Sequence, residues 1–567
     1  MFHFHVAPSG DDSWQGTQER PFATLERAQA AAREVTGDVV VHLGAGTYAL
    51  SAPLELTEAD SGVVYQGDER GESVISGGRE IGGWRERDGV WLADVGDLET
   101  RQLYVDGRRA ERAAVDALPG TVAVTETGYT TDSTDPQGWH SPGDVEFVYR
   151  GVYPWTEARC GVAAVTGDAR STVITMAQPA FGWAAELYNA VWGGQSSRGF
   201  GLPTRVENDA SFLTEPGTFV LDRSCPGRHV LRYLPRPGEH PERTRVVAPV
   251  LETLLRAAGT RNVRFEGLMF ADATWLRPSR PEGFLHYHGS GYYDGGAIDR
   301  VTFGEDASVT IPVESSTIPA CVVLEDTAGM GFEGCHFTRL GATGLGLSGG
   351  GDVTVRGCDF DTLSASAVAV IRSRDVLIED NRIRRIGLDY PGSPGITLLG
   401  TRRCTVAQNE VSDVPYCGIV AGPGEGTRIL RNLTADTMTV LADGGGVYLS
   451  GPQGDSHDNG AVIRGNVIKD TRTPYNFALY TDYGASWVTV EENVVMRADN
   501  TSVLQVSPPL EHVVYRGNFW DADPLGHDSP PEGVTYEGNT TIADERKLND
   551  VTAAIQERAG LLRRREP

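Results

Sequence analysis

The sequence predicts an all-β protein whose main body is a right-handed parallel β-helix, a solenoid of stacked coils. Three observations predict this fold. A short phrase recurs at a spacing of about one coil, apolar and polar residues alternate within it, and 69 glycines among 567 residues are typical of a turn-rich β protein. The right hand follows from the crossover rule for parallel strands in one sheet.

The recurring phrase is centred on an anchor residue, with an apolar residue three places before it and an apolar or Thr residue two places after it. Segments 376–383 and 488–495 show the alternation expected of strands with one buried face. Asn at the bend tolerates left-handed backbone, and its amide can bond the next Asn about 4.8 Å away, which predicts a ladder. The anchors are Cys335, Cys358, Asn381, Asn409, Asn432, Asn466, Asn493, Asn518 and Asn539, with gaps of 23, 23, 28, 23, 34, 27, 25 and 21 residues.

Segments nearer the N-terminus extend this pattern. Residues 263–270 have the same phase, and residues 298–303 are interpreted as one more coil. Short strands and Gly-rich turns in 38–80 predict the first coils, and the amphipathic segment 24–35 predicts a helix that caps the open end. A second amphipathic segment, about 549–562, predicts a helix that covers the far end.

Residues 81–250 break the pattern and predict an inserted β-sandwich-like domain, because they are rich in Trp, β-branched residues and turn signals. The expected organisation is therefore an N-terminal cap with the first coils at 1–80, the insertion at 81–250, the main β-helix at 251–548 and a C-terminal helix at 549–567.

The charge and composition of the chain limit the classes of molecule that it can bind. The net charge of −27 opposes binding to nucleic acid, to anionic membranes and to strongly acidic polysaccharides, but not to neutral sugars. No membrane span or signal peptide is visible, so we expect a cytoplasmic protein, or a secreted one if a signal has been removed. Cys335 and Cys358 share the phase of the Asn anchors, which predicts small buried residues rather than a disulfide framework. The expected end caps argue against end-to-end stacking of copies and leave the oligomeric state open.

The longest gap, between Asn432 and Asn466, predicts the position of an active site. Asp443 precedes Gly444–Gly446 and a strand at 447–450, and the matching strand on the next coil is 478–482. Aligning Val447 with Leu479 places Asp443 at the entrance of one strand and Asp482 at the exit of its neighbour.

Two carboxylates would thus lie on adjacent coils at one edge, and the three glycines would let a ligand approach the backbone. Glycoside cleavage needs such a pair, one as acid and one as nucleophile or base. The alternative interpretation of Asp443 is an ordinary turn residue, since Asp is common before glycines. A turn does not explain Asp482, because a carboxylate within an apolar strand is costly unless it has a function or a partner.

Further candidates for substrate binding surround this pair. Tyr448 and Tyr480 come close to the two acids and either bond substrate, tune a carboxylate or stack between coils. Tyr475 and Asn476 precede the Asp482 strand and are expected at the rim.

Other candidates come from aromatic-rich segments elsewhere. Trp275, His286 and His288 either contact sugar or form a packed loop, and Trp155 and Arg159, with Trp139, belong to an insertion that could form one wall of the site. His286 and His288 have the spacing of metal ligands but no third ligand. Asp455, His457 and Asp458 are expected to form a solvated turn rather than a calcium loop. We therefore expect neither a metal nor a cofactor.

Several motifs resemble the β-helix glycosidases of glycoside hydrolase family 141. They are LYVDGRR (103–109), WTEAR (155–159), VENDASFLTEPGTFVLD (206–222), YLPRPGE (233–239), FADATWLRPS (270–279), DGGGVY (443–448) and YTDYG (480–484). The resemblance implies that Asp443 and Asp482 are catalytic and that the substrate is an α-L-fucoside or a xylan-type saccharide. It also implies secretion. Tyr483 stands where the family usually has a further acidic residue.

The expected function is hydrolysis of a glycosidic bond in a neutral plant or microbial saccharide. A polysaccharide lyase or uronate epimerase on the same fold is the first alternative, and a non-catalytic carbohydrate-binding solenoid is the second. The separation of the two carboxyl groups would decide between retention and inversion, and the sequence leaves the roles of the two aspartates open.

Overall fold

The computed structural model describes residues 1–498, 509–525 and 530–562, and it divides into two compact units. The first unit comprises Met1–Gly77, Thr253–Ala271 and Pro319–Pro567, and the second comprises Gly78–Glu252 and Asp272–Ile318. The segment Asp272–Ile318, expected in the main β-helix, therefore belongs to the second unit. The first unit is a right-handed parallel β-helix, which confirms the predicted fold class.

Most complete coils of the first unit have three strands, one on each face, and two coils have an additional short strand, β42 (Thr401–Arg402) or β46 (Gly424–Glu425). The first face contains β4 (Leu54–Leu56), β24 (Leu255–Ala258), β32 (Ala320–Glu325), β35 (Thr343–Ser348), β38 (Val368–Ile371), β41 (Ile396–Leu399), β45 (Ile419–Ala421), β49 (Val447–Pro452) and the start of β52 (Leu479–Glu491).

The second face contains β1 (Phe2–Val6), β2 (Val39–Leu43), β5 (Val63–Gln66), β25 (Arg264–Glu266), β33 (Ala328–Glu333), β36 (Gly351–Arg356), β39 (Arg374–Glu379), β43 (Thr405–Ala407), β47 (Arg428–Leu430), β50 (Ala461–Arg464), the end of β52, β54 (Glu511–Arg516) and β56 (Val534–Glu537).

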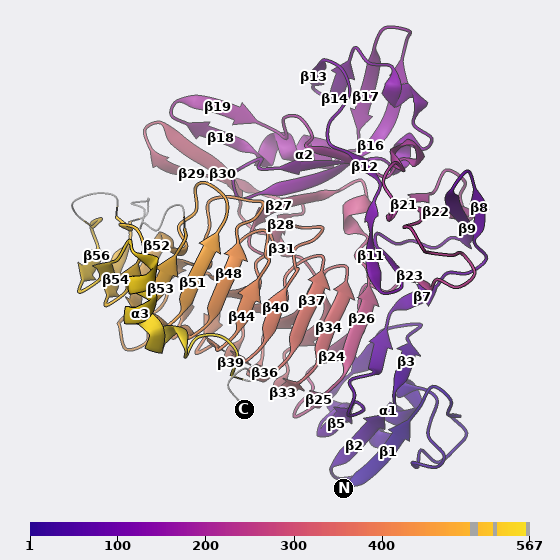
Figure 1. Ribbon diagram of the computed structural model, residues 1–567, viewed down its shortest axis with the longest axis horizontal. Helices are drawn as coiled ribbons and strands as arrows, with labels where there is room; N and C mark the ends of the chain where they lie inside the picture. The colour runs from indigo at the N-terminus through magenta and orange to yellow at the C-terminus, as the bar shows by residue number, and fades with distance from the viewer. Residues whose placement is uncertain (499–508, 526–529, 563–567) are drawn as a thin grey trace. The chain divides into compact units, whose positions relative to one another are not determined.

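The third face lies toward the viewer in Figure 1, where its strands run side by side. It contains β3 (Gly46–Ala49), β6 (Ser73–Ser76), β26 (Met269–Ala273), β34 (His336–Leu340), β37 (Asp359–Leu363), β40 (Arg382–Arg384), β44 (Glu410–Ser412), β48 (Leu433–Thr437), β51 (Val467–Thr471), β53 (Val494–Met496), β55 (Phe519–Trp520) and β57 (Thr540–Thr541). The sequence phrase covers only the second and third faces, so the first-face strand is the part of the coil that it does not encode.

The Asn ladder forms as the anchors predict, but the left-handed backbone expected at the Asn lies one residue earlier, for example at Asp380, Gln408 and Arg431. The Asn381 amide Nδ2 donates to Asn409 Oδ1 at 2.9 Å, and the same bond joins Asn409 to Asn432 at 2.9 Å and Asn432 to Asn466 at 3.0 Å. The ladder continues through Asn493 and Asn518 to Asn539. Each ladder asparagine from Asn381 to Asn493 is fully buried, so the ladder satisfies polar groups that would otherwise destabilise the interior.

Toward the N-terminus, cysteines take the anchor position itself, and phenylalanines stack two places after it. Phe337 stacks on Phe360 with ring centroids 4.5 Å apart, and Phe270 stacks on Phe337 at 5.1 Å. Cys335 and Cys358 are buried and free, and the Cys358 backbone N–H donates to Asn381 Oδ1. The cysteines therefore start the column that the asparagines continue, as the sequence indicates.

The N-terminal helix, α1 (Leu25–Arg33), begins after Thr24, whose hydroxyl accepts from the Arg27 backbone N–H. Leu25 and Ala28 on its apolar side are buried. This confirms the predicted helix and its Thr cap.

The C-terminal helix, α3 (Glu545–Gln556), starts and ends earlier than the predicted 549–567, because Asp544 caps it by accepting from the Lys547 backbone N–H. Leu548 of α3 packs with Val494 and Met496 of the third face, and Figure 1 shows the helix along this face. The prediction that it covers the far end is therefore wrong. Residues 563–567 of the predicted segment lie outside the described residues.

The second unit is built mainly from antiparallel strands. One sheet has β7 (Gly78–Glu80), β8 (Arg85–Arg87), β9 (Val90–Gly96), β10 (Leu103–Val105), β11 (Arg108–Arg112), β21 (Thr218–Asp222), β22 (His229–Leu234) and β23 (Val246–Pro249). Another has β12 (Ala114–Val115), β13 (Val122–Thr125), β14 (Gly128–Thr131), β15 (Glu146–Arg150), β16 (Glu157–Gly167), β17 (Thr172–Met176), β20 (Arg205–Glu207), β27 (Phe284–His288), β28 (Gly291–Tyr293) and β31 (Ser316–Thr317).

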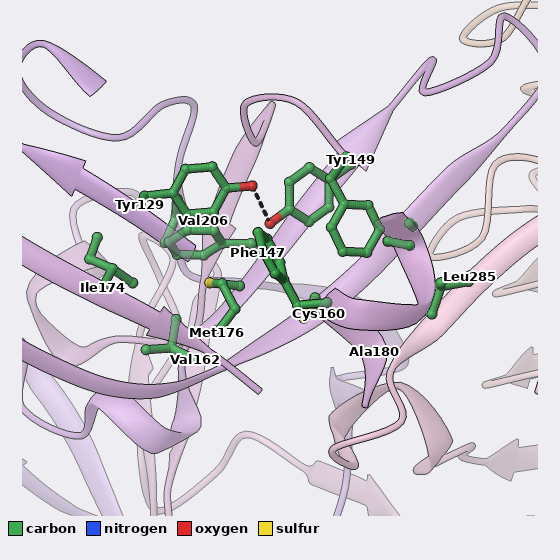
Figure 2. Packing of buried hydrophobic residues seen from close by; sticks show 14 of the residues in the cluster. Tyr129, Phe147, Tyr149, Cys160, Val162, Ile174, Met176, Ala180, Val206 and Leu285 are labelled. Carbon is green, nitrogen blue, oxygen red and sulfur yellow. Dashed lines mark hydrogen bonds between the residues drawn. The ribbon is translucent and has the colours of Figure 1, made fainter. Parts of the chain in front are cut away.

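These two sheets have separate buried cores instead of the single core of a simple sandwich. In the larger core, Tyr129 donates from its hydroxyl to Tyr149 at 2.9 Å amid Phe147, Ile174 and other apolar side chains (Figure 2). The helix α2 (Ala180–Leu187) contributes to the same core.

A third sheet of the second unit corrects one sequence prediction. It contains β18 (Asn189–Trp192), β19 (Gln195–Arg198), β29 (Ile298–Gly304) and β30 (Ala307–Pro312), and β29 pairs antiparallel with β30. Residues 298–303 are therefore half of a hairpin and not a coil of the β-helix. The apolar alternation is common to both structures, so the pattern alone did not distinguish them.

Candidate active site

The predicted register between the two acid-bearing coils is correct. In the parallel pairing of β49 with β52, Val447 lies opposite Leu479, Tyr448 opposite Tyr480 and Ser450 opposite Asp482. Because side chains alternate across a strand, Tyr480 and Asp482 share the outer face of the sheet, and Val447 and Leu479 point into the core. Asp482 thus lies at the end of the first-face strand, as expected.

Asp443 lies at the turn before β49 and has a left-handed backbone conformation, with φ of +57°. Two contacts fix this turn. The Asp443 backbone N–H donates to the Tyr475 carbonyl at 2.8 Å, and the Tyr416 hydroxyl donates to the Asp443 carbonyl at 2.9 Å. Asp is among the few residues that adopt this conformation readily, so local structure alone is compatible with Asp at this position.

The three glycines after Asp443 serve packing between coils, which corrects the expectation that they open the backbone to a ligand. All three are buried. A Cβ on Gly444 would lie 2.6 Å from Cys417 Sγ, one on Gly445 would lie 2.5 Å from the Ala478 carbonyl oxygen, and one on Gly446 would lie 2.5 Å from Thr434 Oγ1. The space beside each glycine is therefore filled by the protein itself.

Two tyrosines contact the two carboxylates. The Tyr448 hydroxyl donates to Asp482 Oδ2 at 2.8 Å, and the Tyr480 hydroxyl reaches Asp443 Oδ1 at 3.5 Å. Their rings meet edge to face with centroids 5.2 Å apart. Both tyrosines are buried, while Asp443 and Asp482 are partly exposed, so solvent and ligand can reach the acids from outside.

Electrostatics separate Asp443 from an ordinary turn residue. Burial, together with the nearby Asp482 carboxylate, raises the pKa of Asp443 to about 7, and the hydrogen bond from Tyr480 opposes this rise. Burial, followed by the two carboxylates, also holds the pKa of Tyr448 and of Tyr480 well above the usual value. Near neutral pH the site therefore has a carboxyl group poised to give up a proton, beside neutral phenols.

The two predicted rim residues differ from each other. Tyr475 is 48% exposed, and burial of the rest of the side chain and then the charges of Asp443 and Asp482 raise its pKa to about 12. Asn476 is fully buried, so its side chain is not at a rim. Its Nδ2 donates to the Thr473 carbonyl, and its Oδ1 has no hydrogen-bond partner within the described parts of the chain.

The remaining predicted residues lie in the second unit, where most of them pack internally. Trp275 is buried edge to face against Phe284, and buried His286 bonds the Gly289 carbonyl through Nε2 while burial lowers its pKa to about 4. His288 is partly exposed.

The predicted residues of the insertion pack in the same way. Trp155 packs partly buried against Tyr153, and buried Trp139 meets Phe147 edge to face. Buried Arg159 forms an ion pair with Glu207 at 2.8 Å.

Sequence reasoning missed Tyr416, Cys417, Ser450 and Phe477. Tyr416 and Cys417 support the Asp443 turn from the preceding coil, Ser450 bonds the Tyr448 hydroxyl, and Phe477 packs 4.1 Å from the Tyr480 ring. The sequence contained a signal for Tyr416 and Cys417, because YCGIV (416–420) occupies the same position in its coil as GGGVY (444–448) does in the next coil.

Within residues 1–498, 509–525 and 530–562, no three His, Cys, Asp or Glu side chains are grouped so as to hold a metal ion. In the same ranges, no helix is long and apolar enough to cross a membrane.

Comparisons with known proteins agree with the fold. A family model described as "Right handed beta helix region" matches residues 320–508. A solved structure named "Glycoside hydrolase" is similar over 99% of each chain, with a TM-score of 0.75 and 23% identity. Another, "The complex structure of XylC with xylose", has a TM-score of 0.53 and 13% identity, covering 91% of this chain and 75% of that one. No curated protein matches the sequence. The chain thus has the fold of right-handed β-helix proteins, a fold shared with a glycoside hydrolase.

Proposed function

We propose that this protein is a glycoside hydrolase in which Asp443 is the general acid and Asp482 is the nucleophile, or the base that activates water. The observation that carries the proposal is the pair itself. A carboxyl group whose pKa is raised to about 7 by burial and by a second carboxylate lies one coil away from that carboxylate. Two carboxyl groups whose environments differ are the arrangement that glycoside cleavage uses.

The chemistry follows from the two environments. Protonated Asp443 donates its proton to the glycosidic oxygen as the bond to the anomeric carbon breaks. The Asp482 carboxylate stabilises the positive charge that develops on the sugar, and it attacks the anomeric carbon or removes a proton from the attacking water. Loss of the Asp443 proton would place two carboxylates beside each other, but the positive charge on the sugar offsets that of Asp482 in the same step.

The comparisons support the reaction class, because the structure most similar in extent and TM-score among those described is named a glycoside hydrolase. The motif resemblance to glycoside hydrolase family 141 supports an α-L-fucoside or a xylan-type saccharide as substrate. We propose Tyr475, at the surface beside both acids, as the first residue to contact the sugar. The buried side chains beneath this surface would hold the two acids in place; they are Tyr448, Tyr480 and Asn476.

In the second unit, His288 and Trp155 are the predicted residues whose side chains are partly exposed, and we propose that they contact a saccharide at that unit's own surface. Trp275, His286 and Arg159 are buried in the interior of that unit. Their proposed part is to support the unit's surface and not to touch the sugar directly.

A lyase or uronate epimerase fits the electrostatics less well. Such an enzyme must neutralise the carboxylate of its substrate with a cation. The charges that shift the pKa of Asp443 and Tyr475 come from Asp443 and Asp482, and no cationic side chain of the described residues contributes. A uronate would therefore meet like charge at this site.

The test is an activity screen of the purified protein on aryl α-L-fucosides, aryl β-D-xylosides, xylan oligosaccharides and uronate polymers. We expect release of a reducing sugar and loss of this activity in Asp443→Asn and in Asp482→Asn. Asp413→Asn is the matched control, because Asp413 has the same left-handed conformation, with φ of +55°, but is exposed on the preceding coil. Products with a new ultraviolet absorbance from an unsaturated sugar would show a lyase instead. Full activity in both site variants would exclude these residues.

A further inference from the structure

The two tyrosines of the site occupy unequal positions relative to the two acids. Tyr448 and Tyr480 are direct partners in the β49–β52 register, on the outer face of adjacent coils. The Tyr448 hydroxyl lies 2.8 Å from Asp482 Oδ2, which is the length of a strong hydrogen bond. The Tyr480 hydroxyl lies 3.5 Å from Asp443 Oδ1, at the limit of hydrogen bonding. The geometry therefore favours one carboxylate over the other.

Both rings are fixed by their surroundings, so this inequality is built into the fold. The exposed fractions of Tyr448 and Tyr480 are 4% and 2%. The Tyr480 ring packs against Phe477 at 4.1 Å and edge to face against Tyr448 at 5.2 Å. Ser450, which lies opposite Asp482 in the register, bonds the Tyr448 hydroxyl and orients it.

Neutral phenols can only donate to these carboxylates. Burial and the nearby acids keep both tyrosines protonated across the working pH range. A hydrogen bond donated to a carboxylate stabilises its ionised form, and a short bond does so more than a long one. Of the two Asp482 oxygens, Oδ2 is the one that accepts from Tyr448, and Asp482 is partly exposed, so Oδ1 remains available to a ligand.

We propose that Tyr448 is the positioning residue that holds Asp482 as the anion with Oδ1 as its reacting oxygen, and that Tyr480 is the weaker donor to the acid Asp443. The unequal bonds from the two tyrosines thus add to the difference that burial makes between the two carboxylates. This inference rests on the proposed function and deepens it, because it says which oxygen reacts and which side chain positions the anion.

The test compares Tyr448→Phe with Tyr480→Phe, since each variant removes one hydroxyl and keeps the buried ring. Tyr448→Phe is expected to lower kcat about 10- to 100-fold with little change in KM, because one hydrogen bond to a charged group is lost. It should also move the acidic limb of the pH–rate profile to higher pH. Tyr480→Phe should move the alkaline limb to higher pH and lower kcat less. The two variants therefore shift opposite limbs.

The matched control is Tyr515→Phe. The Tyr515 hydroxyl is also buried and bonds Thr481 Oγ1 at 2.9 Å, beside Asp482 in the chain but in the interior of the coil. Its loss should lower the melting temperature and leave both limbs where they are. The same shifts in Tyr515→Phe, or unmoved limbs in Tyr448→Phe, would overturn the inference.

Asp482→Asn separates this inference from the proposed function. If Asp482→Asn is inactive while Tyr448→Phe retains the wild-type profile, only the role of Tyr448 is wrong. If Asp482→Asn retains full activity, the assignment of the site is wrong as well, and with it the role of Tyr448.

Discussion

Asp443→Asn should stabilise the folded protein above neutral pH while it removes activity. Burial and the charge of Asp482 raise the pKa of Asp443 to about 7, so ionised Asp443 destabilises the fold. Each pKa unit corresponds to about 1.4 kcal/mol, and the gap from the ordinary value of about 4 therefore amounts to about 4 kcal/mol. Asp443 is partly exposed, so we expect about half of this, about 2 kcal/mol. Asn keeps the left-handed turn and removes the charge.

The sign of the pH dependence follows from the raised pKa. Between pH 4 and pH 7, approximately, folded Asp443 binds a proton that the unfolded chain has lost, so wild-type stability falls as pH rises through this window. The Asn variant lacks this fall. Its advantage should be absent near pH 4, grow toward pH 7 and stay constant above it.

Thermal melting at pH 4, 6 and 8 measures this difference, which should reach a few degrees at pH 8. Asp413→Asn, exposed and in the same backbone conformation, should change the melting temperature little at any of these pH values. An Asp443→Asn variant that is no more stable at pH 8 than at pH 4, relative to wild type, would refute the reasoning. Asp443 would then be an ordinary turn residue.

Three further predictions concern the coils and the thiols. Asn432→Ala should lower the free energy of unfolding by about 3 kcal/mol or more, because it leaves buried polar groups on both neighbouring coils without a hydrogen-bond partner. Asn539→Ala, at the partly exposed end of the ladder, should lower it less, and denaturant unfolding compares the two variants. Gly445→Ala should destabilise or prevent folding, since its Cβ would lie 2.5 Å from the Ala478 carbonyl oxygen, as circular dichroism would show. A thiol reagent should label Cys225 rapidly and the six buried cysteines only after unfolding; rapid labelling of several thiols in the folded protein would contradict the described burial.

The sequence was most informative at positions where only one structural role explains the residue type. A buried Asn directly after a left-handed residue needs partners on both neighbouring coils, so a column of anchors specified the coils and their register. The same logic located the acids, because the widest gap marked the coil with extra residues and the alignment of Val447 with Leu479 was correct.

Other features depend on tertiary surroundings that no local pattern encodes. Residues 298–303 alternate like a coil yet form a hairpin, because alternation reports one buried face and not the partner strand. Gly444–Gly446 looked like an opening for a ligand, but the neighbouring coil fills the space beside them. The raised pKa of Asp443 likewise results from burial and from Asp482, neither of which is local to the Asp443 turn.

The central claim is that Asp443 supplies a proton to the leaving group, and one kinetic comparison tests it most directly. Asp443→Asn and wild type are assayed on two glycosides of the same sugar, one with a dinitrophenyl leaving group and one with an alkyl or sugar leaving group. Only the poor leaving group needs protonation, and a positioned acid contributes about 10²- to 10⁴-fold. We predict a loss of this size with the poor leaving group and a much smaller loss with dinitrophenol. An equal loss on both substrates would contradict the account.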